Sequence, residues 1–300
     1  NKQNCMKKIL SILFVMLGLN FTTYATNNLK IINTVVGIET DYISDGVKGI
    51  NITYRYNFLP LEEENHNDTI LSKASFSISA ILYENNKAIE PALGYQSTAN
   101  ANGNAAFGFD FLSNEMQASK FDKKKSLFIP YAALKLSQGN HVISVKTLFS
   151  GTDGTGNKHE QKLIKENIEF SKPKTNTFTL NIDFIEATEK NAKGNVWDIA
   201  FFRTDAPDVG VNVLVGNISV WKKNVNDTYM FAVGPNSKNI TFTISENDRV
   251  ELLIQDIDLL FHDFIAQLFF ETKKLKTNQV YMYDTPKGNI KSCSLNYKID

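Results

Sequence analysis

The chain has 300 residues, with 32 basic and 32 acidic side chains and a formal net charge of zero. This balance gives no bulk electrostatic indication of nucleic-acid binding. The length leaves room for two ordinary domains after a short leader.

The first 25 residues are typical of a secretory signal peptide. Met6-Lys7-Lys8 supplies a basic start, residues 9–19 are apolar, and Thr23-Tyr24-Ala25 resembles a cleavage site of small residues. The apolar run is too short to span a bilayer. We therefore expect cleavage near Ala25 and a secreted or periplasmic mature chain. Cys293 would then be the single cysteine of that chain, which allows no intrachain disulfide.

The first half of the mature chain contains short runs rich in β-branched and aromatic residues. They alternate between apolar and polar positions, and no segment of similar length has a helical stripe. This pattern predicts an antiparallel β-sandwich, with strands at 49–56, 74–83, 141–149 and 163–170.

Two connections in this half have a clear pattern. Residues 129–134 favour one short helical turn between strands. The Gly-rich stretch 151–156 is expected to be the loop of a hairpin between the last two strands. It is not a phosphate-binding loop, because no Lys-Ser or Lys-Thr pair follows it and no helix begins there.

A domain boundary is expected at 171–177, which is polar and contains Pro173. The sequence therefore predicts an all-β fold of two antiparallel β-sandwich domains, covering residues 26–172 and 173–300. Further strands in the second domain are expected at 178–184, 209–215, 280–283 and 290–297.

The segment 249–263 reads as a strand whose inward face begins apolar and ends in carboxylates. Side chains alternate along a strand, so Val250, Leu252, Ile254, Asp256 and Asp258 share one face. An unpaired buried carboxylate is costly, so we expect the two aspartates at the rim of the core. With Asp263 from the next turn they form a concentrated negative site that suits a hard cation with oxygen ligands, usually calcium.

The second half resembles a C2 domain, an eight-stranded β-sandwich whose end loops bind calcium through aspartates. Asp256-Ile-Asp258 followed by Asp263 matches the order of the family's third calcium loop, and Pro207-Asp208-Val209 stands where its first loop ends. Ala266 departs from the family's usual glycine. The resemblance covers about residues 178–297 and implies a calcium site formed by Asp198, Asp208, Asp256, Asp258 and Asp263, with Asp205 able to replace either of the first two.

Two alternatives to a calcium site remain open at this stage. The aspartates can simply organise loops by accepting backbone N–H bonds, which would make the protein a metal-free structural or adhesion module. A secreted hydrolase using the same carboxylates is a third reading. It is less favoured, because a general acid needs one carboxyl group in an apolar pocket.

The tip of the predicted calcium loop carries Leu259, Leu260 and Phe261. Apolar side chains at a loop tip need cover, either from a membrane interface or from the protein itself. We expect them to pack within the protein, so membrane docking is possible but not favoured. The partner would then be another protein or a cell surface, and not a nucleic acid.

No catalytic motif is present. The four histidines occur in unrelated contexts without metal-ligand spacing, and neither a Gly-x-Ser-x-Gly elbow nor a base near Cys293 is evident. We therefore expect an exported, non-catalytic protein.

Overall fold

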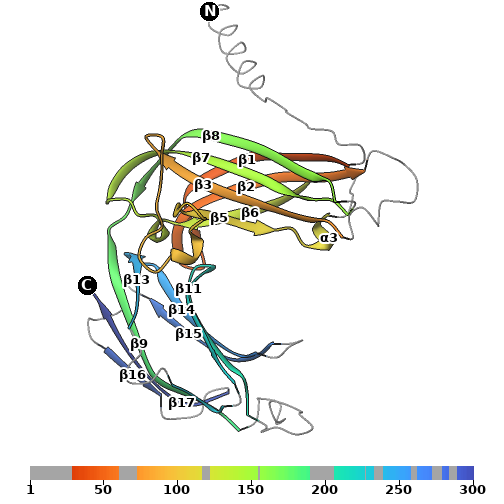
Figure 1. Cartoon of the computed structure of the whole chain (residues 1–300). Helices are drawn as coiled ribbons and strands as arrows, with labels where there is room; N and C mark the ends of the chain where they lie inside the picture. Colours follow the sequence, from red (N-terminus) through yellow and green to blue (C-terminus); the bar gives the residue numbers. More distant parts are fainter. Residues whose placement is uncertain are drawn as a thin grey trace, which may run out of the picture.

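The computed structural model describes residues 29–60, 73–116, 122–154, 156–189, 206–226, 228–232, 239–257, 262–271, 279–283 and 289–300. The predicted leader, residues 1–25, lies outside these ranges. The described chain is almost entirely β-strand, and its strand pairs are antiparallel, which confirms the all-β sandwich fold (Figure 1). No described helix is long and apolar enough to cross a membrane.

The N-terminal half forms two facing sheets. One has the order β1-β2-β6; the other has the order β4-β3-β7-β8, with β5 also paired to β3. The strands are β1 (Leu29–Ser44), β2 (Val47–Pro60), β3 (Ser75–Glu84), β4 (Lys87–Ala88), β5 (Ala106–Asp110), β6 (Lys123–Pro130), β7 (Gly139–Thr152) and β8 (Lys158–Lys172). The described residues of this half also include the short helices η1 (Gln96–Thr98), α3 (Ser113–Met116) and η2 (Tyr131–Ala133).

The alternation of apolar and polar residues along the strands determines which side chains form the core of this half. Every second residue of β3 is buried, and Phe76 packs against Phe149 of β7 and Phe58 of β2, with ring centroids 5.4 and 5.1 Å away. Burying each such ring contributes roughly 1.5–3 kcal/mol. The predicted hairpin of β7 and β8 and the predicted short helical turn, now η2, are both present. The hairpin loop begins slightly later than predicted, because Gly151 still pairs with His159.

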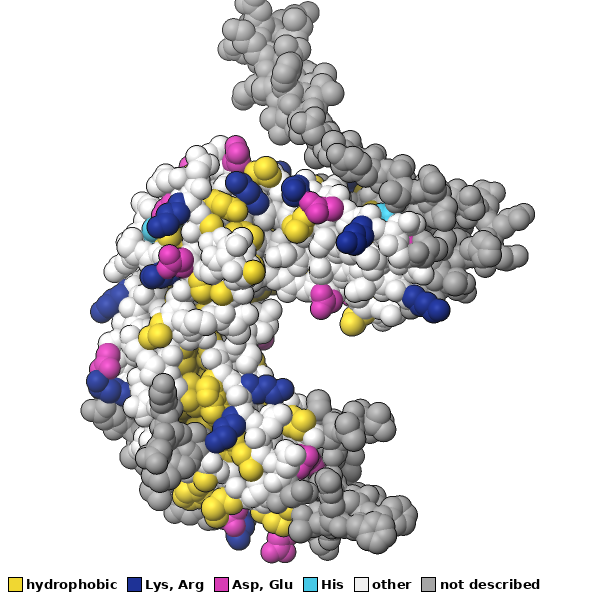
Figure 2. Space-filling view, in the orientation of Figure 1, with side chains coloured by type: hydrophobic (Ala, Val, Ile, Leu, Met, Phe, Trp, Pro, Cys, Tyr) yellow, Lys and Arg dark blue, Asp and Glu magenta, His cyan; other side chains and the backbone are white. Residues whose placement is uncertain are grey.

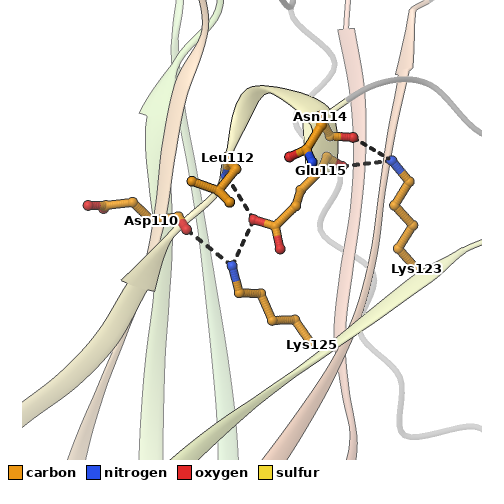
Figure 3. A network of polar contacts seen from close by, with 6 residues as sticks. All are labelled: Asp110, Leu112, Asn114, Glu115, Lys123 and Lys125. Carbon is orange, nitrogen blue, oxygen red and sulfur yellow. Dashed lines mark hydrogen bonds and ion pairs between the residues drawn. The ribbon is translucent and has the colours of Figure 1, made fainter. Parts of the chain in front are cut away.

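A polar network closes one edge of this sandwich, between β5, α3 and β6 (Figure 3). The ammonium of Lys125 contacts Glu115 Oε2 at 2.7 Å and lies 4.5 Å from the centre of the Phe109 ring. Lys123 donates to the carbonyl of Glu115 at 2.9 Å, and Glu115 Oε2 also accepts the N–H of Leu112 at 2.8 Å. The lysines of β6 thus tie the short helix α3 to the opposite sheet.

The C-terminal half is a second sandwich of two sheets. One has the order β11-β10-β14-β15, and in the other β9 lies between β17 and the successive strands β12 and β13, with β16 beyond β17. If β12 and β13 count as one interrupted strand, the described residues form two four-stranded sheets. The strands are β9 (Thr175–Ala187), β10 (Val209–Val215), β11 (Ile218–Val225), β12 (Met230–Ala232), β13 (Ile240–Ser245), β14 (Arg249–Ile257), β15 (His262–Glu271), β16 (Gln279–Tyr283) and β17 (Ile290–Ile299).

The connection between the halves is short. β8 ends at Lys172 and β9 begins at Thr175, and among the described residues no strand pair joins β1–β8 to β9–β17. Lys172 is buried, donates to the carbonyl of Leu136 at 2.7 Å, and has its pKa lowered to about 8 by that burial. That either half folds alone, as the boundary at residue 173 implies, stays a prediction.

The two sandwiches meet in an extensive junction and give the molecule a curved outline, hollowed on one side (Figure 2). The N–H of Thr243 in β13 donates to the carbonyl of Leu93 at 2.9 Å, and the hydroxyl of Tyr95 donates to the carbonyl of Thr243 at 3.0 Å. The turn after β10 packs Gly216 against Val47. Buried hydrophobic side chains of both halves form one continuous cluster.

Gly94 allows a very close approach in this junction. It has φ +87°, and a Cβ placed there would lie 2.2 Å from Phe242 Cβ. An L side chain in the left-handed region costs about 1–2 kcal/mol, and overpacking adds typically about 1–3 kcal/mol. Gly94→Ala is therefore expected to lower the free energy of unfolding by the sum of both effects, measured by denaturant or thermal unfolding of the full chain.

Gly103→Ala is the matched control. Gly103 also has a positive φ, +76°, but nothing lies within 4 Å of an added Cβ. It should show the backbone effect alone, so the difference between the two variants measures the steric contact at the junction. Equal losses would contradict this role for Gly94.

Candidate metal-binding end of the C-terminal sandwich

The inward face of β14 matches the sequence pattern. Val250, Leu252, Ile254 and Asp256 are all 0% exposed, and the residues between them are partly exposed. The apolar members pack against the facing sheet as predicted. Asp258, the last predicted member of this face, lies outside the described residues.

The sequence predicts Asp256 at the rim of the core, and it is the second-to-last residue of β14, but the protein encloses it there. Its side chain is fully buried, and its Oδ1 accepts the N–H of Asp208 at 2.8 Å. The next residue, Ile257, donates its N–H to the carbonyl of Asp208 at 2.8 Å. The carboxylate thereby takes the place of a backbone acceptor where β10 begins, which offsets part of its desolvation cost.

The strand register brings three of the five predicted ligands to one end of a sheet. Asp256 of β14 is opposite Val209, directly after Asp208, and on its other side it is opposite Asp263 of β15. Asp208 is partly exposed. The side chain of Asp263 is not among those described, and neither are Asp198 and Asp205, so the five-residue ligand set stays a prediction. Among the described residues, no group of three or more His, Cys, Asp or Glu side chains is arranged around a common metal position.

This end of the sandwich is the one remote from the N-terminal half. β10 starts here and ends at the turn where Gly216 contacts Val47, and β14 starts at the junction, where the N–H of Arg249 donates to the carbonyl of Gly46 at 3.2 Å. The two strands therefore run the length of the sandwich, with the junction at one end and the aspartates at the other.

The predicted apolar tip, Leu259, Leu260 and Phe261, lies outside the described residues, so its surroundings are not tested. Along the described strand β15, Phe264 and Phe269 are 54% and 46% exposed; Phe264 lies near the start of the strand, and Phe269 is opposite Glu251, towards the junction. Phe269 is covered in part by the guanidinium of Arg249, 4.4 Å from the ring centre. Sequence reasoning missed these two rings, although a phenylalanine outside the inward register of a strand is a visible signal.

Two histidines are more deeply engaged than their sequence contexts suggested. His141 is buried, with Nδ1 2.7 Å from Glu84 Oε1 and Nε2 3.0 Å from the carbonyl of Ser137. His159 is also buried, with Nε2 3.1 Å from Asp153 Oδ2. Both lie on the inward faces of β7 and β8, so the period-2 pattern could have identified them. Both histidines belong to the N-terminal sandwich, and not to the end of the C-terminal sandwich that carries Asp208 and Asp256.

Two other features offer no evident reactive group. Cys293 is buried, and burial raises the pKa of its thiol to about 11, which disfavours the reactive thiolate. A pocket of about 260 Å³ lies beside the β3–β4 hairpin and is lined by Glu84, Lys87, Ala88, Ile89, Glu90, Lys135 and Leu136. Its carboxylates and ammonium groups are balanced, and Glu90 and Lys135 pair at 2.6 Å.

No protein-family model matches the chain, and no curated protein matches it. Among solved structures, a fragment of extended synaptotagmin 2 with its SMP domain and two C2 domains aligns with 99% of this chain and 65% of its own length, at 10% identity and TM-score 0.29. Human GIVD cytosolic phospholipase A2 aligns with 92% of this chain and 33% of its own, at 8% identity and TM-score 0.26. A DUF4466 family protein from Parabacteroides merdae aligns with 91% of this chain and 99% of its own length, at 10% identity and TM-score 0.24.

The chain spans less than two thirds of the length of the first two structures. Likeness at these TM-scores carries no argument about function. The C2 resemblance therefore rests on the aspartate pattern of this sequence, and the coordinates independently establish the β-sandwich.

The Asp256 contact leads to a stability prediction. Asp256→Ala leaves the N–H of Asp208 without its acceptor and removes a fully buried side chain, so we expect a loss of about 1–3 kcal/mol in the free energy of unfolding. Asp256→Asn keeps a carbonyl oxygen for that N–H and should lose less. Chemical denaturation of the full chain measures both.

Glu251→Ala supplies the control on the same strand. Glu251 lies on the outer face of β14, where it accepts an exposed hydrogen bond from Gln267 at 2.6 Å. Its loss should change stability by less than about 0.5 kcal/mol. The structural role of Asp256 would be refuted if its alanine variant were no less stable than the Glu251 variant.

Proposed function

We propose that the protein is an exported, non-catalytic binding module whose C-terminal sandwich takes a calcium ion at the end of β10, β14 and β15. The observation that carries this proposal is the register that aligns Asp208, Asp256 and Asp263 at one end of one sheet. The sequence pattern adds Asp198 and Asp258 from the adjoining segments. This end faces away from the N-terminal sandwich, so that sandwich does not cover it.

The donor chemistry fits a hard cation. Carboxylate oxygens are the ligands that calcium prefers, and an oxygen that accepts one N–H bond retains a lone pair for a second interaction. Asp208, Asp256 and Asp263 would hold the ion, with Asp198 and Asp258 completing the set. A bound ion would neutralise the negative charge at this end and so allow a protein or cell-surface partner to approach.

The distribution of perturbed side chains supports a non-catalytic role. Within the described residues, Tyr54, Lys172 and Cys293 have clearly shifted pKa values because they are buried in separate parts of the structure. Groups tuned for catalysis gather in a shared cleft. These three do not gather. Asp248 and Tyr95, whose pKa values are also raised, interact with each other, but both are buried inside the junction between the sandwiches.

The second candidate is a metal-free structural or adhesion module. The bond from the Asp208 N–H to Asp256 favours it, because the carboxylate already organises the start of β10 without a cation. The two candidates differ in their response to calcium and can be separated by one experiment.

Thermal unfolding of the full chain, with calcium and with a chelator, is that experiment. An ion that binds only the folded state stabilises it by about 2.7 kcal/mol at a hundred times its dissociation constant. We expect calcium to raise the melting temperature and Asp256→Asn combined with Asp258→Asn to abolish the rise. Asp110→Asn, an exposed position on β5, should respond like the wild type. An unchanged wild-type melting curve in millimolar calcium would support the metal-free candidate instead.

Co-sedimentation with lipid vesicles tests whether the partner is a membrane. We favour a protein or cell-surface partner over lipid, because an exported protein need not meet an anionic leaflet. Calcium-dependent co-sedimentation with phosphatidylserine vesicles, weakened by Phe261→Ala and reversed by chelator, would point to membrane docking through residues 259–261 instead.

A further inference from the structure

One carboxylate is buried inside the junction between the two sandwiches. Asp248, in the turn between β13 and β14, is 1% exposed. Its Oδ2 accepts the N–H of Ser245 in its own turn at 2.7 Å, and its Oδ1 accepts the N–H of Lys48 from β2 at 3.3 Å. A single carboxyl group therefore bridges segments that are 200 residues apart in the chain.

Residues before and after Asp248 in the chain also form hydrogen bonds across the junction. The N–H of Arg249 donates to the carbonyl of Gly46 at 3.2 Å. In β13, the N–H of Thr243 donates to the carbonyl of Leu93, and the carbonyl of Thr243 accepts the hydroxyl of Tyr95. The turn that holds Asp248 thus contributes directly to the docking of β13 and β14 against the N-terminal sandwich.

The charged groups near Asp248 do not supply a close counter-ion. The ammonium of Lys48 pairs with Asp41 at 3.0 Å, and the guanidinium of Arg249 is directed to Asp45 at 3.9 Å and to the Phe269 ring. The loop of the N-terminal half contributes buried Tyr95, whose hydroxyl donates to the Thr243 carbonyl. Two further charged residues of this region, Glu246 in the same turn and Lys174, whose carbonyl accepts the N–H of Glu246 at 3.1 Å, are exposed. The turn after β10 contributes no titratable side chain.

We propose that Asp248 is a proton-controlled latch, which holds the two sandwiches together more tightly when its carboxyl group is protonated than when it is ionised. The physical reason is desolvation. An ionised carboxylate enclosed without a cation is costly, and two backbone N–H bonds offset only part of that cost. Opening the junction would expose the carboxylate to water and relieve the remainder.

The pKa of Asp248 agrees with this geometry. Burial raises it from 3.8 to about 6, against the lowering effect of the hydrogen bonds from Ser245 and Lys48. The stabilising contribution of the raised pKa is fully present below pH 3.8 and is lost as the pH rises through about 6. If opening exposes the carboxyl fully, the opening equilibrium can change by up to roughly a hundredfold across this range.

Amide hydrogen exchange of the full chain, followed by NMR from pH 5 to 8, tests the latch. The reporters are the N–H groups of Lys48, Thr243 and Arg249, whose acceptors lie across the junction. With rates expressed relative to the intrinsic rate at each pH, we expect their protection to fall about tenfold or more as the pH rises. Amides in the interiors of β3 and β10 should show no comparable change.

Two variants complete the test. Asp248→Asn stays neutral and should give junction amides whose protection no longer depends on pH. Asp45→Asn removes an exposed carboxylate of the same junction, with 65% side-chain exposure, and should retain the wild-type dependence. The proposal is overturned if Asp248→Asn keeps the wild-type pH dependence, or if Asp45→Asn abolishes it.

If Asp248→Asn does not fold, the pH dependence of amide exchange in the wild-type chain tests the proposal by itself. A selective loss of protection at the junction supports the latch. Equal responses of the junction and strand-interior amides, or no response at the junction, would overturn it.

Discussion

At the junction, the carbonyl of Leu93 accepts the N–H of Thr243, and Gly94 lets the two backbones come close enough for this bond to form. Backbone polar groups that are buried must find partners, so a loop of the N-terminal half here satisfies the edge of a C-terminal strand. The placement of β13 and β14 follows from this contact. Through them it also affects the position of Asp256, since β14 runs directly from the junction to this residue.

The period-2 pattern was sufficient to predict the sandwich class, the β7–β8 hairpin and the buried face of β14. These features depend on neighbours within one strand or one hairpin, which the sequence displays locally. The junction could not be predicted, because its contacts join residues such as Lys48 and Asp248, for which no local pattern exists. Asp256 was placed on the correct face, but its complete burial was not predicted. Its burial is accompanied by a bond from the N–H of Asp208, which directly precedes β10 and is 48 residues away in the chain.

Buried aspartates follow a common plan in this protein. Asp153 accepts the N–H of Asn157 at 2.9 Å in the β7–β8 loop, Asp248 accepts two N–H groups at the junction, and Asp256 accepts one where β10 begins. Each lies at the end of a strand or next to one. A short acidic side chain is a suitable acceptor at such positions. This plan explains why aspartate clusters at strand ends serve the fold as readily as they serve a cation.

β14 has one of these aspartates at its end and another directly before its start. Asp248 and Asp256 are an even number of positions apart, and both side chains are buried on the inward side. Each accepts an N–H from a different neighbouring segment. A slip of one residue would turn the whole inward set toward solvent and move both carboxylates away from their donors. The pairing register of β14 is therefore specified at both of its ends, in addition to the apolar side chains between them.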